Sequence, residues 1–208
     1  MELIIVILGI SIAYQLNLVN EQRINNQLEL NILRNLEKEV QINIAEFNSL
    51  KAYRKRITKS SRNLLRLLDQ TNIRKDSAEK YIFSLVQTST PDLQRQTTTS
   101  YLNSNYGSTN LDLKNELLSL QTFLQELMDL SESYKVMKKQ DYMNYLKTEV
   151  DFFKRKIIRL EKIQSVEFKN IIWNMAADEF ELNRLYEQAT VQLSKVDSLM
   201  KAVISSYD

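Results

Sequence analysis

The chain has 208 residues but only two glycines and one proline, so it lacks the turn-forming residues that β architectures need and favours long helices. It contains neither cysteine nor histidine, which excludes thiol nucleophiles, Ser-His relays, Cys/His zinc sites and disulfides. The formal net charge of +2 provides no whole-protein field for nucleic acid. We therefore expect an all-α protein that is not an enzyme, has no cofactor or metal and does not bind nucleic acid.

The chain opens with an uncharged apolar run from Leu3 to Tyr14, which passes through Gln15 and Asn17 into an amphipathic pattern. Leu3 to Val19 would span about 26 Å as a helix, against a hydrocarbon core of about 30 Å. We expect residues 1–22 to be a transmembrane anchor and residues 23–208 to be a helical bundle domain. Two alternatives remain open: a cleavable signal peptide ending near Ser11-Ile12-Ala13, and a core helix of a soluble protein.

Small and polar residues follow one face of this first segment. Gly9, Ala13 and Asn17 lie at i, i+4 and i+8, and Asn20 continues the face. Membrane helices approach one another closely along such small-xxx-small stripes. The stripe, which Glu21 could continue in place of Asn20, predicts that the anchor associates with a second copy or with another membrane protein. The alternative is that glycine and alanine are simply common in such spans.

Helical periodicity continues without glycine or proline as far as Leu68, where Thr71-Asn72 marks a break. Asn43, Arg54 and Ser61 fall near the seam of a strict heptad, which argues against a long dimeric coiled coil. The helix therefore needs bundle partners. A short helix capped by Asp76 or Ser77 is expected next, ending before Pro91.

A basic cluster occupies the end of the first predicted helix. Residues 51–75 hold nine basic side chains and one acid, Asp69. A solvated helix face explains this cluster most simply, and attraction to an anionic lipid, a polysaccharide or an acidic protein surface is the alternative. The candidate patch consists of Lys51, Arg54, Lys55, Arg56, Lys59, Arg62 and Arg66.

The segment from Thr97 to Gly107 is the least regular part of the chain. Thr97 to Ser100 are good helix caps, and Gly107 suits a left-handed position after a helix. This segment is predicted to connect helices at one end of the bundle. Alternatively it is an interaction tip, with Tyr101, Tyr106 and Gly107 as candidate contacts.

Periodicity then resumes from Leu113 and continues through Val150, Phe153 and Ile157 to Leu160, and a final helix follows from Phe168 to Val203. The expected architecture is an elongated antiparallel bundle of three long helices with one or two short ones. Ferritin-like metal sites need Glu-x-x-His pairs, so the acidic clusters are expected to be solvated. These clusters are Glu37 and Glu39, and Asp178, Glu179 and Glu181.

The sequence resembles a family of uncharacterised single-span membrane proteins of Gram-negative bacteria. Three places carry the resemblance: the anchor from Glu2 to Asn17 followed by Asn20-Glu21-Gln22-Arg23, the segment with Tyr101-Leu102, Gly107 and Asn110-Leu111, and Glu167-Phe168-Lys169-Asn170. The resemblance implies an inner-membrane protein with a periplasmic body, although the basic residues that precede the span in the family are missing here. It assigns no catalytic residue.

The expected function is therefore a membrane-anchored interaction protein, either a scaffold or an accessory subunit of an envelope complex, and an oligomer. Its expected partners are the lipid bilayer and a second copy or another membrane protein. The alternative function is an extracytoplasmic helical sensor that signals through a partner's membrane helix.

Overall fold

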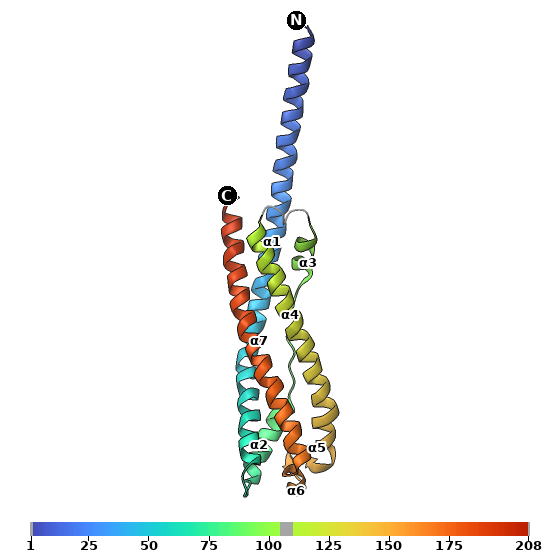
Figure 1. Cartoon of the computed structure of the whole chain (residues 1–208), viewed down its shortest axis with the longest axis vertical. Helices are drawn as coiled ribbons and strands as arrows, with labels where there is room; N and C mark the ends of the chain where they lie inside the picture. Colours follow the sequence, from blue (N-terminus) through green and yellow to red (C-terminus); the bar gives the residue numbers. More distant parts are fainter. Residues whose placement is uncertain (1, 105–109, 208) are drawn as a thin grey trace. The chain divides into compact units, whose positions relative to one another are not determined.

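The fold is all-α, as the composition predicts, with one small β-hairpin (Figure 1). The computed structural model describes residues 2–104 and 110–207, with side chains from Ile7 onward. The elements are α1 (Glu2–Leu68), α2 (Lys75–Leu85), α3 (Gln96–Asn103), α4 (Leu111–Met137), the π-helical turn η2 (Lys138–Met143), α5 (Asn144–Glu149), β1 (Val150–Asp151), β2 (Lys156–Ile157), α6 (Leu160–Ile163) and α7 (Val166–Ser205).

Helix α1 ends at Leu68, where the sequence pattern places its end, and it runs through residue 22 without a break. No helix in the described part of the chain has a stretch that is both long and apolar enough to cross a membrane.

The helices contribute to two compact units. Unit 1 comprises Met1–Ile42, Gln94–Leu118 and Lys195–Asp208, and unit 2 comprises Asn43–Leu93 and Ser119–Ser194. Helices α1, α4 and α7 each contribute residues to both units.

Unit 1 buries apolar side chains from α1, α3, α4 and α7. Its core contains Leu33, Leu36, Val40, Tyr101, Leu113, Leu117, Val196 and Met200. The carboxylate of Glu39 accepts hydrogen bonds from the backbone N–H groups of Thr97 and Thr98 at the start of α3. The predicted cap residues Thr97 to Ser100 therefore lie inside α3 or at its first turn, and a glutamate from α1 satisfies the helix end instead.

Unit 2 packs the second half of α1 against α2, α4, α5 and α7. Phe47 contacts Tyr186, with 5.1 Å between ring centroids, and Arg54 contacts Glu179, so α7 runs antiparallel to α1 in this unit. The core contains Ile57, Leu64, Ile82, Leu85, Leu124, Leu127, Tyr142, Leu146, Phe168, Ile172, Met175 and Leu182. Asn43 and Ser61, polar residues predicted near the helix seam, are also buried.

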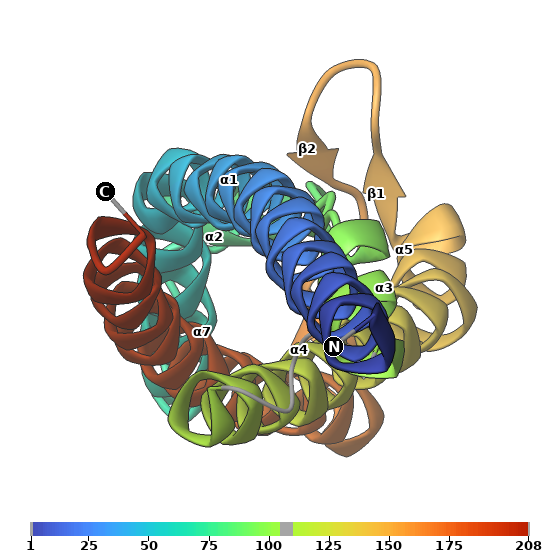
Figure 2. The same cartoon turned by 90° about the horizontal axis from the view of Figure 1, so that it is seen from above.

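A β-hairpin interrupts the region where helical periodicity predicted one continuous helix. Val150 pairs with Ile157 and Asp151 with Lys156. Figure 2 shows the loop between the strands projecting away from the helices, and Phe153 at this loop is 97% exposed. The apolar spacing through Val150, Phe153 and Ile157 was therefore misleading, because β-branched and aromatic residues also favour strands.

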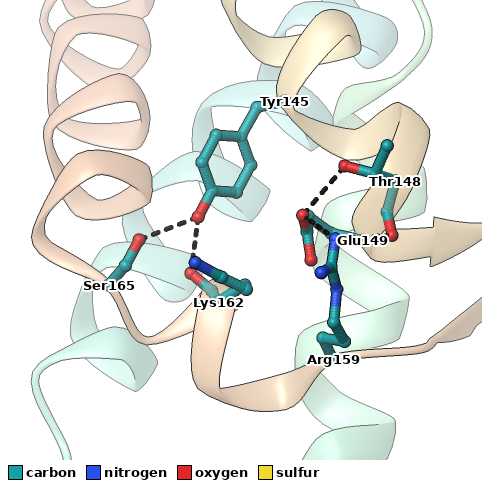
Figure 3. A network of polar contacts seen from close by, with 6 residues as sticks. All are labelled: Tyr145, Thr148, Glu149, Arg159, Lys162 and Ser165. Carbon is teal, nitrogen blue, oxygen red and sulfur yellow. Dashed lines mark hydrogen bonds and ion pairs between the residues drawn. The ribbon is translucent and has the colours of Figure 1, made fainter.

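Polar contacts hold the base of the hairpin to its neighbours (Figure 3). Arg159 donates to Glu149 Oε1 at 2.5 Å, and the Tyr145 hydroxyl donates to the carbonyl of Lys162 at 2.8 Å. The Ile157 N–H donates to Glu79 on α2 at 3.0 Å. These contacts tie the hairpin to α2, and α5 to α6.

The caps predicted for α2 are not used. Its N-cap residue is Arg74, which makes no side-chain capping bond, so Asp76 and Ser77 lie inside the first turn. The helix itself occurs where the sequence predicts it.

Candidate functional site

The basic side chains of α1 form a stripe along one helix face. Lys51, Lys55, Lys59, Arg62 and Arg66 are all exposed. Their spacing of 4, 4, 3 and 4 residues keeps them on one side of a helix with 3.6 residues per turn. Five of the seven residues of the predicted basic patch therefore share one exposed helix face.

These five residues line one wall of a groove in unit 2, which we call the α1–α7 groove. It has a volume of about 730 Å³, and its α1 wall also includes Phe47 and Arg54. The α7 wall is formed by Asn183, Tyr186, Glu187, Thr190 and Val191. Among the described residues that line the groove, Glu187 is the single acid, so the groove is strongly cationic.

The five exposed cations of the stripe make no ion pair or hydrogen bond within the described residues. Glu187, opposite them, instead accepts a hydrogen bond from Asn183 at 3.0 Å. The positive charge of the groove is therefore available to a ligand rather than neutralised by the bundle.

Arg54 differs from the rest of the predicted basic patch because it is buried. Its Nη2 lies 2.7 Å from Oε2 of Glu179, and both side chains are almost fully inaccessible to solvent. Its guanidinium also lies over the Tyr186 ring, 5.2 Å from the ring centroid. The prediction of solvated faces was wrong for Glu179 and also for Glu39, because opposing helices cover both carboxylates.

Two further polar side chains adjoin this buried pair. Burial, together with the negative charge of Glu179, raises the pKa of Tyr134. Lys138 lies in η2, its amine donates to the carbonyl of Gln87, and it lies 5.2 Å from the Tyr134 ring centroid. Burial lowers the pKa of Lys138 to about 8, and it raises the pKa of Glu179 despite the nearby Arg54 guanidinium. The side chains of Arg54, Glu179, Tyr134 and Lys138 therefore form a buried polar cluster inside unit 2, next to the groove.

A second, smaller hollow of about 250 Å³ continues the seam between α1 and α7. It shares Thr58 and Arg62 with the α1–α7 groove. Its α7 side presents Trp173 and Phe180, which are 64% and 63% exposed. Val191, on the wall of the larger groove, is 70% exposed. The seam therefore combines a cationic side from α1 with an apolar side from α7.

Trp173, Phe180 and Val191 lie outside the apolar periodicity of α7, which follows its buried face. That face includes Phe168, Met175 and Leu182. Large apolar residues that fall outside the buried stripe of a helix are the signal that identifies such a surface.

Arg56, the one patch residue not yet described, contacts side chains outside the groove. It donates to the side chain of Gln87 at 2.8 Å and lies 5.6 Å from the centroid of the Tyr53 ring. It does not line the groove.

The predicted interaction tip is not an exposed surface where the structure describes it. Tyr101 is fully buried in unit 1, and burial raises its pKa to about 12. This part of the prediction was wrong, because the tyrosine faces the core of unit 1. Tyr106 and Gly107 lie outside the described residues.

The residues predicted to mediate membrane-helix association all lie on the exposed N-terminal part of α1. Gly9, Ala13, Asn17 and Asn20 are exposed, and an added Cβ at Gly9 would meet no described atom within 4 Å apart from its chain neighbours and the backbone of its own helix turns. The Asn17 amide donates to Glu21 at 2.9 Å.

No group of three or more metal-ligating side chains occurs among residues that the structure describes. No family model, curated protein or solved structure matches the chain.

Proposed function

We propose that this protein is a membrane-anchored, non-enzymatic interaction protein that serves as a scaffold or accessory subunit of a bacterial envelope complex. The observation that carries this proposal is the exposed apolar surface of the N-terminal part of α1. Every residue from Ile7 to Leu28 is exposed. Among the described residues of unit 1, Figure 1 shows no other segment beside the start of this helix, drawn in blue.

The large apolar side chains of this stretch cover most of the helix circumference, and the remaining face carries the small and polar residues named above. Exposed large apolar residues occur at Ile7, Leu8, Ile10, Ile12, Tyr14, Leu16, Leu18 and Val19. A helix that is apolar on most sides is stable when lipid or protein covers it. Each Å² of apolar surface withdrawn from water contributes about 25 cal/mol. The uncharged run of the sequence begins at Leu3, so the proposed anchor comprises Leu3 to Val19.

The polar groups of the stretch suit an apolar environment. The Ser11 hydroxyl donates to the carbonyl of Ile7 at 2.9 Å, which satisfies it within the helix. Asn17 and Glu21 pair near the end where the proposed span would reach the interface. The small-residue face of Gly9 and Ala13 offers room for a second helix, which supports association inside the membrane.

The non-enzymatic part of the proposal rests on composition. Without histidine or cysteine the chain cannot build the commonest nucleophilic and acid-base centres. The inner-membrane location and the periplasmic body rest on the family resemblance of the sequence.

Membrane fractionation tests the anchor. We expect the full chain to resist extraction by alkaline carbonate, and Ile10→Asp/Ile12→Asp to move it into the soluble fraction, because two charges inside a short span oppose insertion. Phe153→Asp changes an even more exposed apolar residue on the hairpin, and this control should stay with the membrane. A wild-type chain that is monodisperse in buffer and does not bind lipid would contradict the anchor.

Cysteine crosslinking tests association. The chain has no cysteine of its own, so a single Ala13→Cys substitution provides an unambiguous reporter. We expect oxidation in native membranes to trap a disulfide-linked dimer, whereas Ser11→Cys, on the opposite helix face, should trap much less. Equal trapping at both positions would reject the small-residue face.

A further inference from the structure

We propose that the α1–α7 groove, together with the adjoining hollow at Trp173 and Phe180, binds an acidic amphipathic helix of a partner protein. This inference rests on the interaction role proposed above and names the class of partner.

The cationic side of the groove has the periodicity of a helix. The stripe from Lys51 to Arg66 is about 22 Å long, with successive charges about 4 to 6 Å apart along the axis. Acidic side chains at i, i+4 and i+8 of a helix lying alongside would have the same repeat. The cations make no ion pair within the described residues, so binding would not require an existing one to break.

The apolar side of the seam follows one face of α7. Trp173, Phe180 and Val191 are 7 and 11 residues apart, which places all three on one side of the helix over about five turns. Ala176 and Ala177 lie between the two aromatic residues and leave a hollow for a protruding side chain. An amphipathic helix fills such a surface with its apolar ridge, and exposed tryptophan is typical of binding hot spots.

The cationic side on α1 and the apolar side on α7 together favour an acidic amphipathic helix over other anionic ligands. A free anion would use the cations and leave the long apolar face of α7 uncovered, and the comparison with anionic vesicles tests a bilayer surface directly. Single-stranded nucleic acid stacks bases on successive aromatic rings, but here two rings are two helical turns apart and the third apolar contact is a valine. A helix with an acidic flank and an apolar ridge uses both sides.

Trp173 is the only tryptophan in the chain and reports on occupancy directly. The binding experiment uses the full chain and an 18-residue synthetic helix with leucine at i, i+3, i+4 and i+7 spacing and glutamate along one flank. We expect a saturable blue shift of Trp173 emission, and binding at least about tenfold weaker when glutamine replaces every glutamate.

Matched variants locate the binding site. Lys55→Glu/Lys59→Glu should weaken binding of the acidic helix about tenfold or more. Lys80→Glu/Lys139→Glu makes the same charge change at exposed positions outside the groove and should leave affinity unchanged within about twofold. Phe180→Ser should weaken both the acidic and the glutamine helix, because both use the apolar ridge. Far-UV circular dichroism confirms that each variant is folded.

The chain is measured in zwitterionic nanodiscs if it partitions into lipid and in buffer if it does not, so failure of the anchor and failure of the groove are separate results. Equal binding of the acidic and glutamine helices would overturn the proposal. It would also be overturned if a single-stranded oligonucleotide or anionic vesicles shifted Trp173 emission at lower concentration than the acidic helix. A blue shift that grows with protein concentration without added helix would assign the groove to a second copy instead.

Discussion

Two buried glutamates, one in each unit, are stabilised in different ways. Glu39 in unit 1 accepts bonds from the Thr97 N–H at 2.6 Å, the Thr98 N–H at 3.0 Å and the Thr98 hydroxyl at 2.6 Å. Glu179 in unit 2 faces a full cation, Arg54, at 2.7 Å. Nε of Arg54 has no hydrogen-bond partner among the described residues.

These different partners show that a buried glutamate has a different role in each unit. Neutral donors at a helix N-terminus satisfy Glu39 and bring α3 to α1, so its role is structural. The pair in unit 2 is incompletely bonded and lies beside the cationic groove. Natural proteins depart from full polar satisfaction mainly at functional or strained sites.

The largest expected effect comes from removing Glu179. Glu179→Ala leaves Arg54 buried without its counter-ion and should lower the free energy of unfolding by about 3–5 kcal/mol, as measured by urea denaturation. Arg54→Met/Glu179→Met removes both charges and should recover most of this loss. If the single and double variants are equally unstable, packing rather than charge maintains this part of unit 2.

A smaller loss is expected at Glu39. Glu39→Ala removes three hydrogen bonds from the start of α3 and should cost about 1–3 kcal/mol. Hydrogen exchange of the Thr97 and Thr98 amides should accelerate. Glu39→Gln retains an acceptor oxygen and should preserve part of the protection. Unchanged exchange in Glu39→Ala would show that α3 does not depend on this contact.

The smallest effect concerns the pH dependence of unit 2. Burial lowers the pKa of Lys138 to about 8 from 10.5, so above pH 8 the unfolded chain retains a proton that the folded chain has lost. The free energy of unfolding should therefore rise with pH, by up to about 2 kcal/mol between pH 8 and 9.5.

Lys138→Met should abolish this rise, and Lys139→Met, at the exposed neighbouring residue, should retain it. The measurement stops below pH 10 because burial raises the pKa of Tyr134 and Tyr142, so ionisation of the unfolded tyrosines opposes folding at higher pH. A wild-type curve that falls between pH 8 and 9.5 would contradict the lowered pKa.

Helix positions were predictable because they depend on local pattern. The end of α1 at Leu68 follows from the uninterrupted periodicity before Thr71. The prediction failed at Val150, where the spacing fits both a helix and a strand. The strands are held to α2 by the contacts of Glu79 with Ile157 and Lys156, which lie beyond the local pattern.

The candidate site was predictable in part. The spacing of Lys51, Lys55 and Lys59 places them on one face from sequence alone. Arg54 occupies both a basic cluster and the helix seam, and the sequence pattern could not decide between these two roles. The apolar half of the seam was missed because Trp173 and Phe180 belong to the outer face of a helix whose buried face dominated the pattern.

The sequence by itself determined an all-α chain, the extent of its longest helix, the absence of histidine and cysteine chemistry, and the basic stripe, because each depends on composition or on neighbours within a few turns. Tertiary structure decided which charges are buried, where the hairpin forms, and that the basic stripe lies beside an exposed apolar face of α7. These features depend on residues far apart in the chain, such as Arg54 and Glu179, which meet only when α1 and α7 pack antiparallel in unit 2.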